Sequence, residues 1–351
     1  MKVFKGLEPK PTKIEDVARA AGVSIMSVSR AMRGVEGVSE ATRDRITGIA
    51  AQMGYVPNRL AGSLAQATSS LVCISVPTLF DAVFAEIVAG MRETLLHAGL
   101  ETIIETSDYD PDREASWVER MITWSPAALV LSGVDHTEDV RERLRSAEIT
   151  VMELWDVTES PIDLCVGLDH RDAGLQMGQH LIDQGYRNPA YIGITKGRDP
   201  RAEKRMQGVA DAFGKNGMDL NVIRTEAAPS FEAGYDGVMR ALALPSRPDV
   251  FYFLNDHLAV GGLMACDTAG LEVPGEMGIA GFNGLNINNV LPRRLTTSIT
   301  PRALMGKTAA RMLVAALRGV RTEHKITMPV TIDPGATTGP KLTGSKPSAQ
   351  L

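Results

Sequence analysis

The sequence predicts an N-terminal helix-turn-helix headpiece of three helices, followed by a larger α/β body with two similar lobes. Two patterns lead to this fold class. Residues 14–53 contain three short helical patterns separated by glycine turns. From residue 70 onward, short apolar runs alternate with helical patterns, and the alternation restarts after residue 168. A chain of 351 residues has room for both parts.

The headpiece prediction rests on the spacing of three residues. Ala18 is followed four residues later by Gly22, and Val28 stands six residues beyond that glycine. The small side chain lets two helices approach, the glycine turns the chain, and the valine packs the second helix on the first. Ser24 is a suitable N-cap for the second helix. This is the spacing of a helix-turn-helix, which places its second helix in the major groove of DNA.

A third helix is predicted after Val38, with Ser39 as its N-cap. Its apolar side chains repeat at helical spacing and would close a three-helix core: Ile46, Ile49, Ala50 and Met53. Residues 57–69 are expected to form a hinge helix and linker, begun by Pro57. This segment is too short to form a stable helix alone.

The body is expected to contain two doubly wound, parallel sheets, because buried apolar runs alternate with helices such as those predicted at residues 82–96 and 113–124. The strands predicted for the first lobe are Leu71–Val76, Thr102–Ile104, Ala128–Leu131 and Thr150–Leu154. Those predicted for the second lobe are Ala190–Gly193, Val250–Leu254 and Gly278–Phe282. Ligands of such sheets bind beyond the carboxyl ends of the strands, so we expect a site between the lobes.

The sequence contains no recognisable catalytic apparatus. Gly306-Lys307-Thr308 resembles the end of a phosphate-binding loop, but the glycine required five positions earlier is Pro301, so this segment is predicted to start a helix. We find no dinucleotide-binding glycine motif, zinc-binding histidine motif or nucleophile elbow in the sequence. The expectation is therefore no enzyme, no metal site and no cofactor.

The charge distribution favours a nucleic-acid partner for the headpiece alone. The net charge is −5, but residues 1–65 hold ten Lys and Arg against six Asp and Glu. The remaining residues hold 27 basic residues against 36 acidic ones. A basic headpiece can neutralise phosphates while an acidic body stays off the duplex.

Composition indicates a globular protein with a cytoplasmic location. Hydrophobic residues make up 44% of the chain and charged residues 23%, and no run approaches the roughly 18 apolar residues of a membrane helix. The first 11 residues lack the apolar segment of a secretory signal. The three cysteines, Cys73, Cys165 and Cys266, lie in separate apolar runs and are expected to be buried, reduced thiols.

The segment after the third helix carries the pattern Tyr55-x-Pro57-Asn58-x-x-Ala61-x-x-Leu64. With this pattern and the helix-turn-helix, the chain resembles the lactose-repressor (LacI) family of bacterial transcription regulators, from about Lys13 to about Pro334. The resemblance implies a DNA-binding headpiece (1–56), a hinge (57–69) and a periplasmic-binding-protein-like effector and dimerisation domain (70–335). It also implies three chain crossings between the lobes, with residues 300–334 returning to the first lobe. A disordered tail is expected over 336–351 because this stretch is rich in Gly, Pro and Ser.

The resemblance also assigns residues to DNA. Ile25, Met26 and Arg30 occupy base-reading positions, where apolar side chains contact thymine methyl groups and arginine binds guanine. The alternative for Ile25 and Met26 is a place in the core. Leu64 matches a leucine that wedges into the central base step; the alternative is packing within the linker. Phosphate contacts are expected from Ser24, Ser29, Arg33, Ser39 and Asn58.

For the effector cleft, the resemblance indicates Asp156, Arg205, Asn255, Asn283 and Arg302. Two arginines, with an amide at 283 where many family members carry an acid, favour an acidic ligand. A surface ion pair is an equal alternative for Arg302. Segments such as Thr300-Pro301-Arg302 resemble the gluconate-utilisation branch of the family, so gluconate or a related aldonate is the expected effector.

Together, these expectations predict a homodimeric repressor that binds a palindromic operator. An effector would release it from the operator by an allosteric change. A dimer is preferred because the tail lacks the leucine heptads of tetrameric relatives. Alternatives within the family are a neutral sugar, a sugar phosphate or a purine as ligand, acting as inducer or corepressor. Two other classes are disfavoured: a secreted sugar-binding protein has no use for the headpiece, and an α/β enzyme would need catalytic residues.

Overall fold

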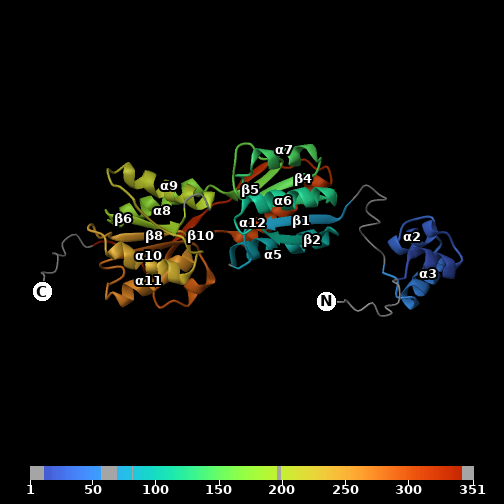
Figure 1. Ribbon diagram of the computed structural model, residues 1–351, viewed down its shortest axis with the longest axis horizontal. Helices are drawn as coiled ribbons and strands as arrows, with labels where there is room; N and C mark the ends of the chain where they lie inside the picture. The colour runs from blue at the N-terminus through green and yellow to red at the C-terminus, as the bar shows by residue number, and fades with distance from the viewer. Residues whose placement is uncertain (1–11, 57–68, 81, 196–198, 342–351) are drawn as a thin grey trace, which may run out of the picture. The chain divides into compact units, whose positions relative to one another are not determined.

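The structure is a computed structural model that describes residues 12–56, 69–80, 82–195 and 199–341 (Figure 1). The chain divides into two compact units, one ending at Ser69 and one beginning at Ser70. The proposed hinge, including Asn58 and Leu64, lies outside the described residues.

The first unit is the predicted three-helix headpiece, with helices α1 (Ile14–Ala21), α2 (Ile25–Arg33) and α3 (Glu40–Gln52). Gly22 ends α1 in the left-handed conformation (φ 63°), which glycine adopts without strain. Ser24 caps α2 as predicted, since its Oγ accepts the Ser27 N–H (3.1 Å). Ser39 holds the N-cap position of α3, but its hydroxyl bonds to the Thr42 hydroxyl (2.8 Å) instead of the backbone. The buried core is Val17, Ala18, Ala21, Val28, Ala31, Ile46 and Ala50.

The first lobe of the second unit is a six-stranded parallel sheet in the order β11-β5-β4-β3-β1-β2. Its strands are β1 (Leu71–Val76), β2 (Glu101–Thr106), β3 (Ala128–Ser132), β4 (Thr150–Asp156), β5 (Leu164–Leu168) and β11 (Lys325–Thr327). Helices α5 (Ala82–His97) and α12 (Arg302–Leu317) cover one face, and α6 (Pro111–Thr123) and α7 (Glu138–Ser146) cover the other. The prediction that residues 102–104 form a buried strand was wrong about burial, because β2 lies at the sheet edge and is half exposed.

The second lobe repeats this plan with the order β12-β10-β9-β8-β6-β7. Its strands are β6 (Pro189–Ile194), β7 (Asn221–Thr225), β8 (Val250–Phe253), β9 (Gly278–Asn283), β10 (Thr296–Ile299) and β12 (Thr331–Asp333). Its helices are α8 (His170–Asp183), α9 (Pro200–Gly214), α10 (Phe231–Leu242) and α11 (Asp256–Thr268) (Figure 1). The expectation of an all-parallel sheet is wrong at one edge, where β12 runs antiparallel to β10.

The chain crosses between the lobes three times, as predicted. It passes from β5 to α8, from β10 to α12, and from β11 to β12. Two expectations for the end of the chain need correction. The last segment returns to the first lobe only as far as β11, and β12 rejoins the second lobe. Residues 336–341 are not a free tail, because the buried Thr337 hydroxyl donates to the Ile279 carbonyl (2.7 Å) and accepts the Thr296 N–H (2.8 Å).

Glycines allow the closest helix contacts in both lobes. A side chain at Gly306, in α12, would place a Cβ 2.0 Å from the Ile87 carbonyl oxygen of α5. Gly306-Lys307-Thr308 is thus helical, as predicted, and its glycine serves packing between helices. Gly261, in α11, would collide in the same way with the Phe231 carbonyl of α10 at 1.8 Å. These contacts let the paired helices α5–α12 and α10–α11 pack closely on one another.

A buried carboxyl group anchors the strand ends of the second lobe. Asp256, the first residue of α11, is fully buried. Its carboxylate oxygens accept the Thr297 hydroxyl of β10 (2.6 Å) and the Leu285 N–H (2.7 Å). Burial raises the pKa of Asp256 to about 6, against the lowering effect of these hydrogen bonds.

We expect Gly261→Ala to destabilise the second lobe by about 1–3 kcal/mol, because a backbone carbonyl cannot move aside as a side-chain tip can. Gly214→Ala is the matched control: it lies in α9, a Cβ added there would meet nothing within 4 Å, and it should be neutral or slightly stabilising. Chemical denaturation of both variants measures the difference. Equal stabilities for the two variants would contradict this account of α10–α11 packing.

The raised pKa of Asp256 predicts a pH-dependent stability. A carboxyl group with a higher pKa in the folded state stabilises the fold at low pH, and this contribution is lost as the pH rises through the folded pKa, here about 6. Relative to Asp256→Asn, the unmodified chain should lose about 2 kcal/mol of unfolding free energy between about pH 4 and about pH 7. Parallel stability profiles for the two proteins would show that this carboxyl group does not titrate as described.

Candidate functional site

The exposed side of α2 is the candidate surface for reading DNA. Val28 and Ala31 face the headpiece core, whereas Ile25 and Met26 are 48% and 62% exposed. Of the two interpretations offered by the sequence for Ile25 and Met26, the outward orientation is confirmed. Exposed apolar side chains at the start of a recognition helix can contact thymine methyl groups. Their contact with bases stays a prediction.

Arg30 lies on the same helix and is exposed. Its Nη1 would be 3.1 Å from a Cβ at Gly37, so the guanidinium rests over the turn between α2 and α3. Gly37 also has φ +99°, in the left-handed region. The remaining described residues assigned to phosphates, Ser24, Ser29, Arg33 and Ser39, are exposed or half-exposed on this unit. Nothing in the structure tests Asn58 and Leu64, which lie outside the described residues.

The candidate effector site lies between the lobes of the second unit, where several strands end in polar residues. Ser132 ends β3, Asp156 ends β4, and Asn283 ends β9. Asn255 follows β8 and caps α11 by accepting the Leu258 N–H (3.1 Å). The carboxyl ends of parallel strands are where α/β sheets bind ligands.

Helix α9 presents three cations to this region. Arg201, Lys204 and Arg205 have the spacing that places side chains on one face of a helix. Arg201 Nη1 donates to the Ser132 hydroxyl (3.1 Å), and Lys204 Nζ contacts Asp156 (2.6 Å) and Asp135 (3.2 Å). These contacts join the second lobe to the first.

The charges of this cluster are strongly perturbed. Burial raises the pKa of Asp156, and Lys204 opposes that rise. Burial also disfavours ionised Asp199, but the neighbouring guanidinium groups of Arg201 and Arg205 outweigh burial and lower its pKa to about 2. Asp199 Oδ1 accepts from Arg201 Nε at 2.8 Å. Arg201 and Lys204 are therefore each neutralised by carboxylates.

Arg205 differs from the other two cations. It is 4% exposed, and its guanidinium carbon lies 4.0 Å from the centre of the Phe282 ring. Nη1 donates to His170 Nδ1 (3.0 Å) and Nη2 to the Leu254 carbonyl (3.1 Å). Within the described part of the chain, no carboxylate forms an ion pair with Arg205, and its buried Nε has no hydrogen-bond partner.

A second unused polar atom belongs to the residue after Phe282. Asn283 Oδ1 is buried and lacks a hydrogen-bond partner among the residues described. Asn283 also has φ 112°, an unfavourable conformation for a residue with a side chain. Buried polar atoms are normally paired, so an unused donor and an unused acceptor indicate a place for a polar ligand.

Arg302 is engaged by the protein itself. It is 6% exposed and forms an ion pair with Glu86 of α5 (2.9 Å). It also donates to the Thr300 hydroxyl (2.9 Å) and to the carbonyl oxygens of Asn283 and Gly284. Arg302 therefore forms an ion pair, which was the alternative considered from the sequence, but the arginine is buried and not on the surface. Its contact with an effector stays a prediction that this geometry does not favour.

Sequence reasoning missed several residues of the cleft: Ser132, His170, Asp199, Arg201 and Lys204. Helical spacing from Arg205 was a usable signal for Arg201 and Lys204. No sequence signal separated His170 from the other histidines. The three cysteines are buried and free, as expected.

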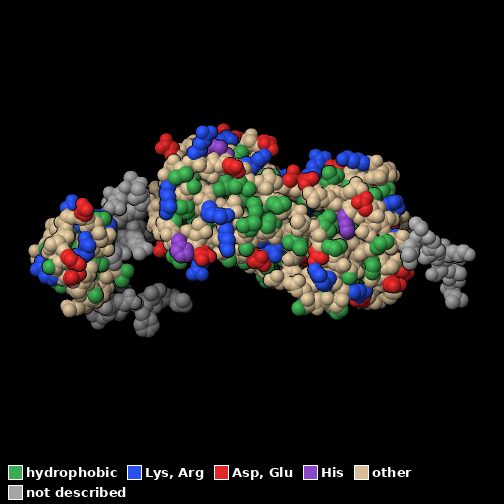
Figure 2. Space-filling view, turned by 180° about the vertical axis from the view of Figure 1, so that it is seen from behind, with side chains coloured by type: hydrophobic (Ala, Val, Ile, Leu, Met, Phe, Trp, Pro, Cys, Tyr) green, Lys and Arg blue, Asp and Glu red, His purple; other side chains and the backbone are tan. Residues whose placement is uncertain are grey.

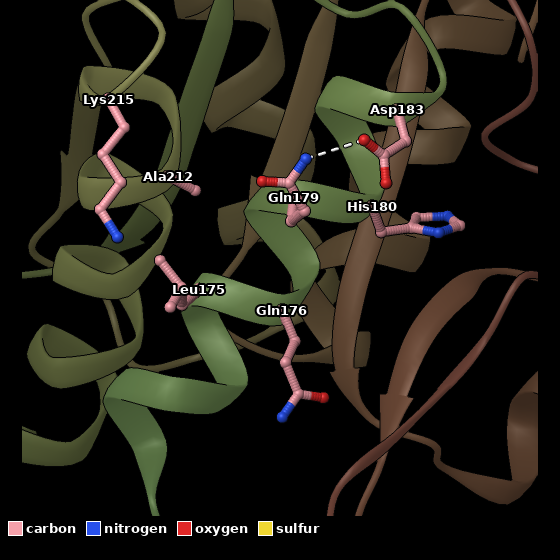
Figure 3. Close-up of a pocket in the computed structure, with 7 residues that line it drawn as sticks. All are labelled: Leu175, Gln176, Gln179, His180, Asp183, Ala212 and Lys215. Atoms are coloured by element: carbon pink, nitrogen blue, oxygen red, sulfur yellow. Dashed lines mark hydrogen bonds between the residues drawn. The ribbon is translucent and has the colours of Figure 1, made fainter.

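A hollow of about 430 Å³ on the second lobe is a poor candidate for the effector site (Figure 3). It lies between the carboxyl-terminal halves of α8 and α9, whereas His170 and Arg205 lie near the helix starts. Gln179 and Asp183, which line it, are hydrogen-bonded to each other (2.8 Å). Over the described residues we find no cluster of side chains suited to a metal ion and no helix able to cross a membrane.

Comparison with known proteins agrees with both units. Residues 13–58 match the model of bacterial regulatory proteins of the lacI family, and residues 179–338 match that of a periplasmic binding protein-like domain. The chain is 33% identical to the HTH-type transcriptional regulator GntR of Escherichia coli K12, over 94% of this chain and 99% of that protein. It is also 33% identical to the regulator IdnR of the same strain, over 89% of this chain and 93% of that protein.

Solved structures give the same result. A LacI family transcriptional regulator from Silicibacter pomeroyi superposes with a TM-score of 0.88 at 34% identity, covering 94% of this chain and all of that one. The lac repressor dimer bound to operator shares the fold at a TM-score of 0.79 and 22% identity, over 94% of this chain and 100% of that one. This is a family of DNA-binding regulators that carry an effector domain, and not of enzymes. The chain belongs to the LacI family of bacterial transcriptional regulators.

Proposed function

We propose that this regulator represses genes of sugar-acid catabolism and leaves its palindromic operator when it binds gluconate or a related aldonate. The observation that carries the choice of ligand is Arg205, a buried cation without a carboxylate partner in the described structure. Asp199 pairs directly with Arg201 and compensates the Arg205 charge only from farther away. A buried charge that lacks a direct partner is costly, so an anionic ligand is favoured there. The carboxylate of an aldonate can accept from the unused Nε, in a charge-assisted hydrogen bond.

The rest of the cleft fits the polyol part of such a ligand. The unused Asn283 Oδ1 can accept a hydrogen bond from a sugar hydroxyl. An amide at this position adds no negative charge that would repel the carboxylate. The similarity to GntR and IdnR, which are gluconate and idonate regulators, supports the same ligand class.

We also propose a homodimer, because a palindromic operator requires two headpieces related by twofold symmetry. Apolar side chains remain exposed on the first lobe, and Figure 2 shows green, hydrophobic side chains gathered on one face of the larger unit. Residues of the first lobe with large exposed apolar side chains include Leu79, Phe80, Leu96, Ile104 and Leu304. Such patches are typical of protein–protein interfaces.

The proposed mechanism is a population shift. The effector binds more tightly to one arrangement of the lobes. In this arrangement, the pairing of the two hinge segments of the dimer on DNA is less favourable. Leu64 is proposed as the residue that wedges into the operator from the hinge. By linkage, operator binding weakens effector binding by the same factor.

The effector is tested by thermal unfolding with gluconate, other hexonates, their phosphates, neutral sugars and purines. A ligand at about 100 times its dissociation constant adds about 2.7 kcal/mol of stability. Arg205→Met keeps a long side chain on Phe282 but removes the charge, and we expect it to weaken aldonate binding about 10- to 100-fold. Operator affinity without ligand should change little. Lys215→Met is the control: it removes a positive charge from the hollow between α8 and α9, and this variant should bind aldonate normally.

A thermal shift with neutral sugars or purines alone would replace the sugar acid by that ligand and leave the regulator assignment intact. Equal aldonate binding by Arg205→Met and the unmodified chain would remove Arg205 from the effector site.

The DNA-reading surface is tested with Arg30→Ala. If Arg30 binds guanine, the variant should lose about 1–3 kcal/mol of operator affinity and discriminate less at one base pair in each half-site. Arg45→Ala removes an exposed arginine of α3 and is the matched control for charge. A uniform loss for both variants on specific and random DNA would assign Arg30 to phosphates.

A further inference from the structure

His170 occupies the first crossing between the lobes. The chain leaves the first lobe at the end of β5, and two residues later His170 begins α8 of the second lobe. The side chain is buried, with 1% of the residue exposed. It lies directly beside Arg205, the residue on which the proposed effector site depends.

Two hydrogen bonds determine the proton position on the ring. Arg205 Nη1 lies 3.0 Å from Nδ1, and Nε2 lies 2.8 Å from the Trp155 carbonyl oxygen. A guanidinium can only donate and a carbonyl can only accept. The ring is therefore neutral, with its proton on Nε2 and a lone pair on Nδ1. Burial and the nearby Arg205 and Arg201 lower the pKa of His170, which the charge of Asp199 opposes.

The ring also joins the aromatic side chains of the two lobes. Its centre is 5.6 Å from Trp155 of the first lobe and 5.9 Å from Phe282 of the second. Trp155 in turn packs edge-on against Phe84 of α5 (5.9 Å), and Phe282 carries the Arg205 guanidinium. A continuous line of contacts thus runs from the effector-site arginine, through His170, into the first lobe.

The acceptor on the first lobe is a constrained strand end. Trp155 has φ 75°, in the left-handed region, which is unfavourable for a side chain of this size. The next residue is Asp156, which binds Lys204 across the cleft. A change in the bond to the Trp155 carbonyl therefore acts where the first lobe meets α9.

The second crossing has a similar arrangement, in which no hydrogen bond to Arg205 is present among the described residues. Arg302 begins α12 directly after that crossing and donates to the carbonyl oxygen of Asn283, which also has a positive φ. Arg302 is held in addition by Glu86 and Thr300. An ion pair between Arg302 and Glu86 thus stabilises the second crossing. The first crossing depends instead on the neutral His170 ring, which accepts a hydrogen bond from Arg205.

We propose that His170 is a positioning residue that couples effector binding at Arg205 to the first lobe through the Trp155 carbonyl. The inference rests on the proposed function, in which an anion binds Arg205. When Arg205 turns toward the anion, its bond to Nδ1 weakens and the ring is free to rotate. The Nε2–H bond to Trp155 then changes with it, and the first lobe shifts relative to α9. The coupling is reciprocal between effector and DNA.

Two substitutions test the two hydrogen bonds of His170 separately. His170→Asn keeps an acceptor near the position of Nδ1 but loses the donor to Trp155. His170→Gln can keep a donor near the position of Nε2 but loses the acceptor for Arg205. The measured quantity is the ratio of operator dissociation constants with and without saturating gluconate. The full-length chain is used throughout, and His180→Asn, on the outer part of the same helix (Figure 3), is the control.

We expect both His170 variants to lower this ratio about tenfold or more, with gluconate still binding. His180→Asn should keep the ratio of the unmodified chain. A merely structural role for His170 would lower thermal stability and leave the ratio at saturation unchanged. An unchanged ratio in both His170 variants would therefore overturn the proposal.

A second measurement needs no effector and uses a variant only to assign the signal. Nitrogen-15 NMR of the histidine side chains, assigned by the loss of one signal in His170→Asn, should show a neutral Nε2–H ring from about pH 5 to about pH 8. A proton on Nδ1, or titration near the ordinary histidine pKa of about 6.5, would overturn the proposal. If gluconate leaves the operator affinity of the unmodified chain unchanged, the proposed effector is wrong. The NMR result still tests the neutral Nε2–H ring on which the His170 proposal depends.

Discussion

One constraint is central to the region between the lobes: the Arg205 guanidinium is buried, and in the described structure no carboxylate lies within ion-pair distance of it. Burial of a charge in this way is tolerated only when polar or aromatic groups surround it. Phe282, His170 and the Leu254 carbonyl supply those groups and leave Nε unused. The guanidinium therefore keeps one donor, Nε, for the proposed anionic ligand.

The fold holds this arrangement rigidly. Close helix pairs need glycine where a carbonyl of one helix touches the next, as at Gly261 and Gly306. Asp256 ties the start of α11 to β10 and to the turn after β9. The strand ends that carry Asn255 and Asn283 are fixed by these contacts. A ligand that changes the cleft must therefore move whole lobes about their crossings, because local deformation would break close packing.

The sequence predicted what depends on local patterns. The helix-turn-helix follows from Ala18, Gly22 and Val28, and seven of the twelve described strands follow from apolar runs. The sequence analysis did not predict β5, β7, β10, β11 and β12. Cleft positions such as Asp156 were assigned from the family resemblance, and the structure places Asp156 at the end of β4. Pairs that are distant in sequence were not predictable: Arg201 meets Ser132 69 residues away, and Arg302 meets Glu86 216 residues away. The buried hydrogen bonds of Thr337 were missed for the same reason, since composition alone suggested a free tail.

Under the proposed function, selectivity for an anion would follow from the same constraint. A neutral sugar would leave Arg205 without a direct anionic partner, whereas an aldonate would supply one. A site built around such a group discriminates more strongly than an apolar pocket does, because the wrong ligand leaves a buried polar group unpaired. Arg205, the residue proposed to bind the carboxylate, is also the one bonded to His170 at the first crossing. Recognition of the ligand and transmission to the first lobe would then depend on the same guanidinium, so a ligand without a carboxylate would fail at both steps.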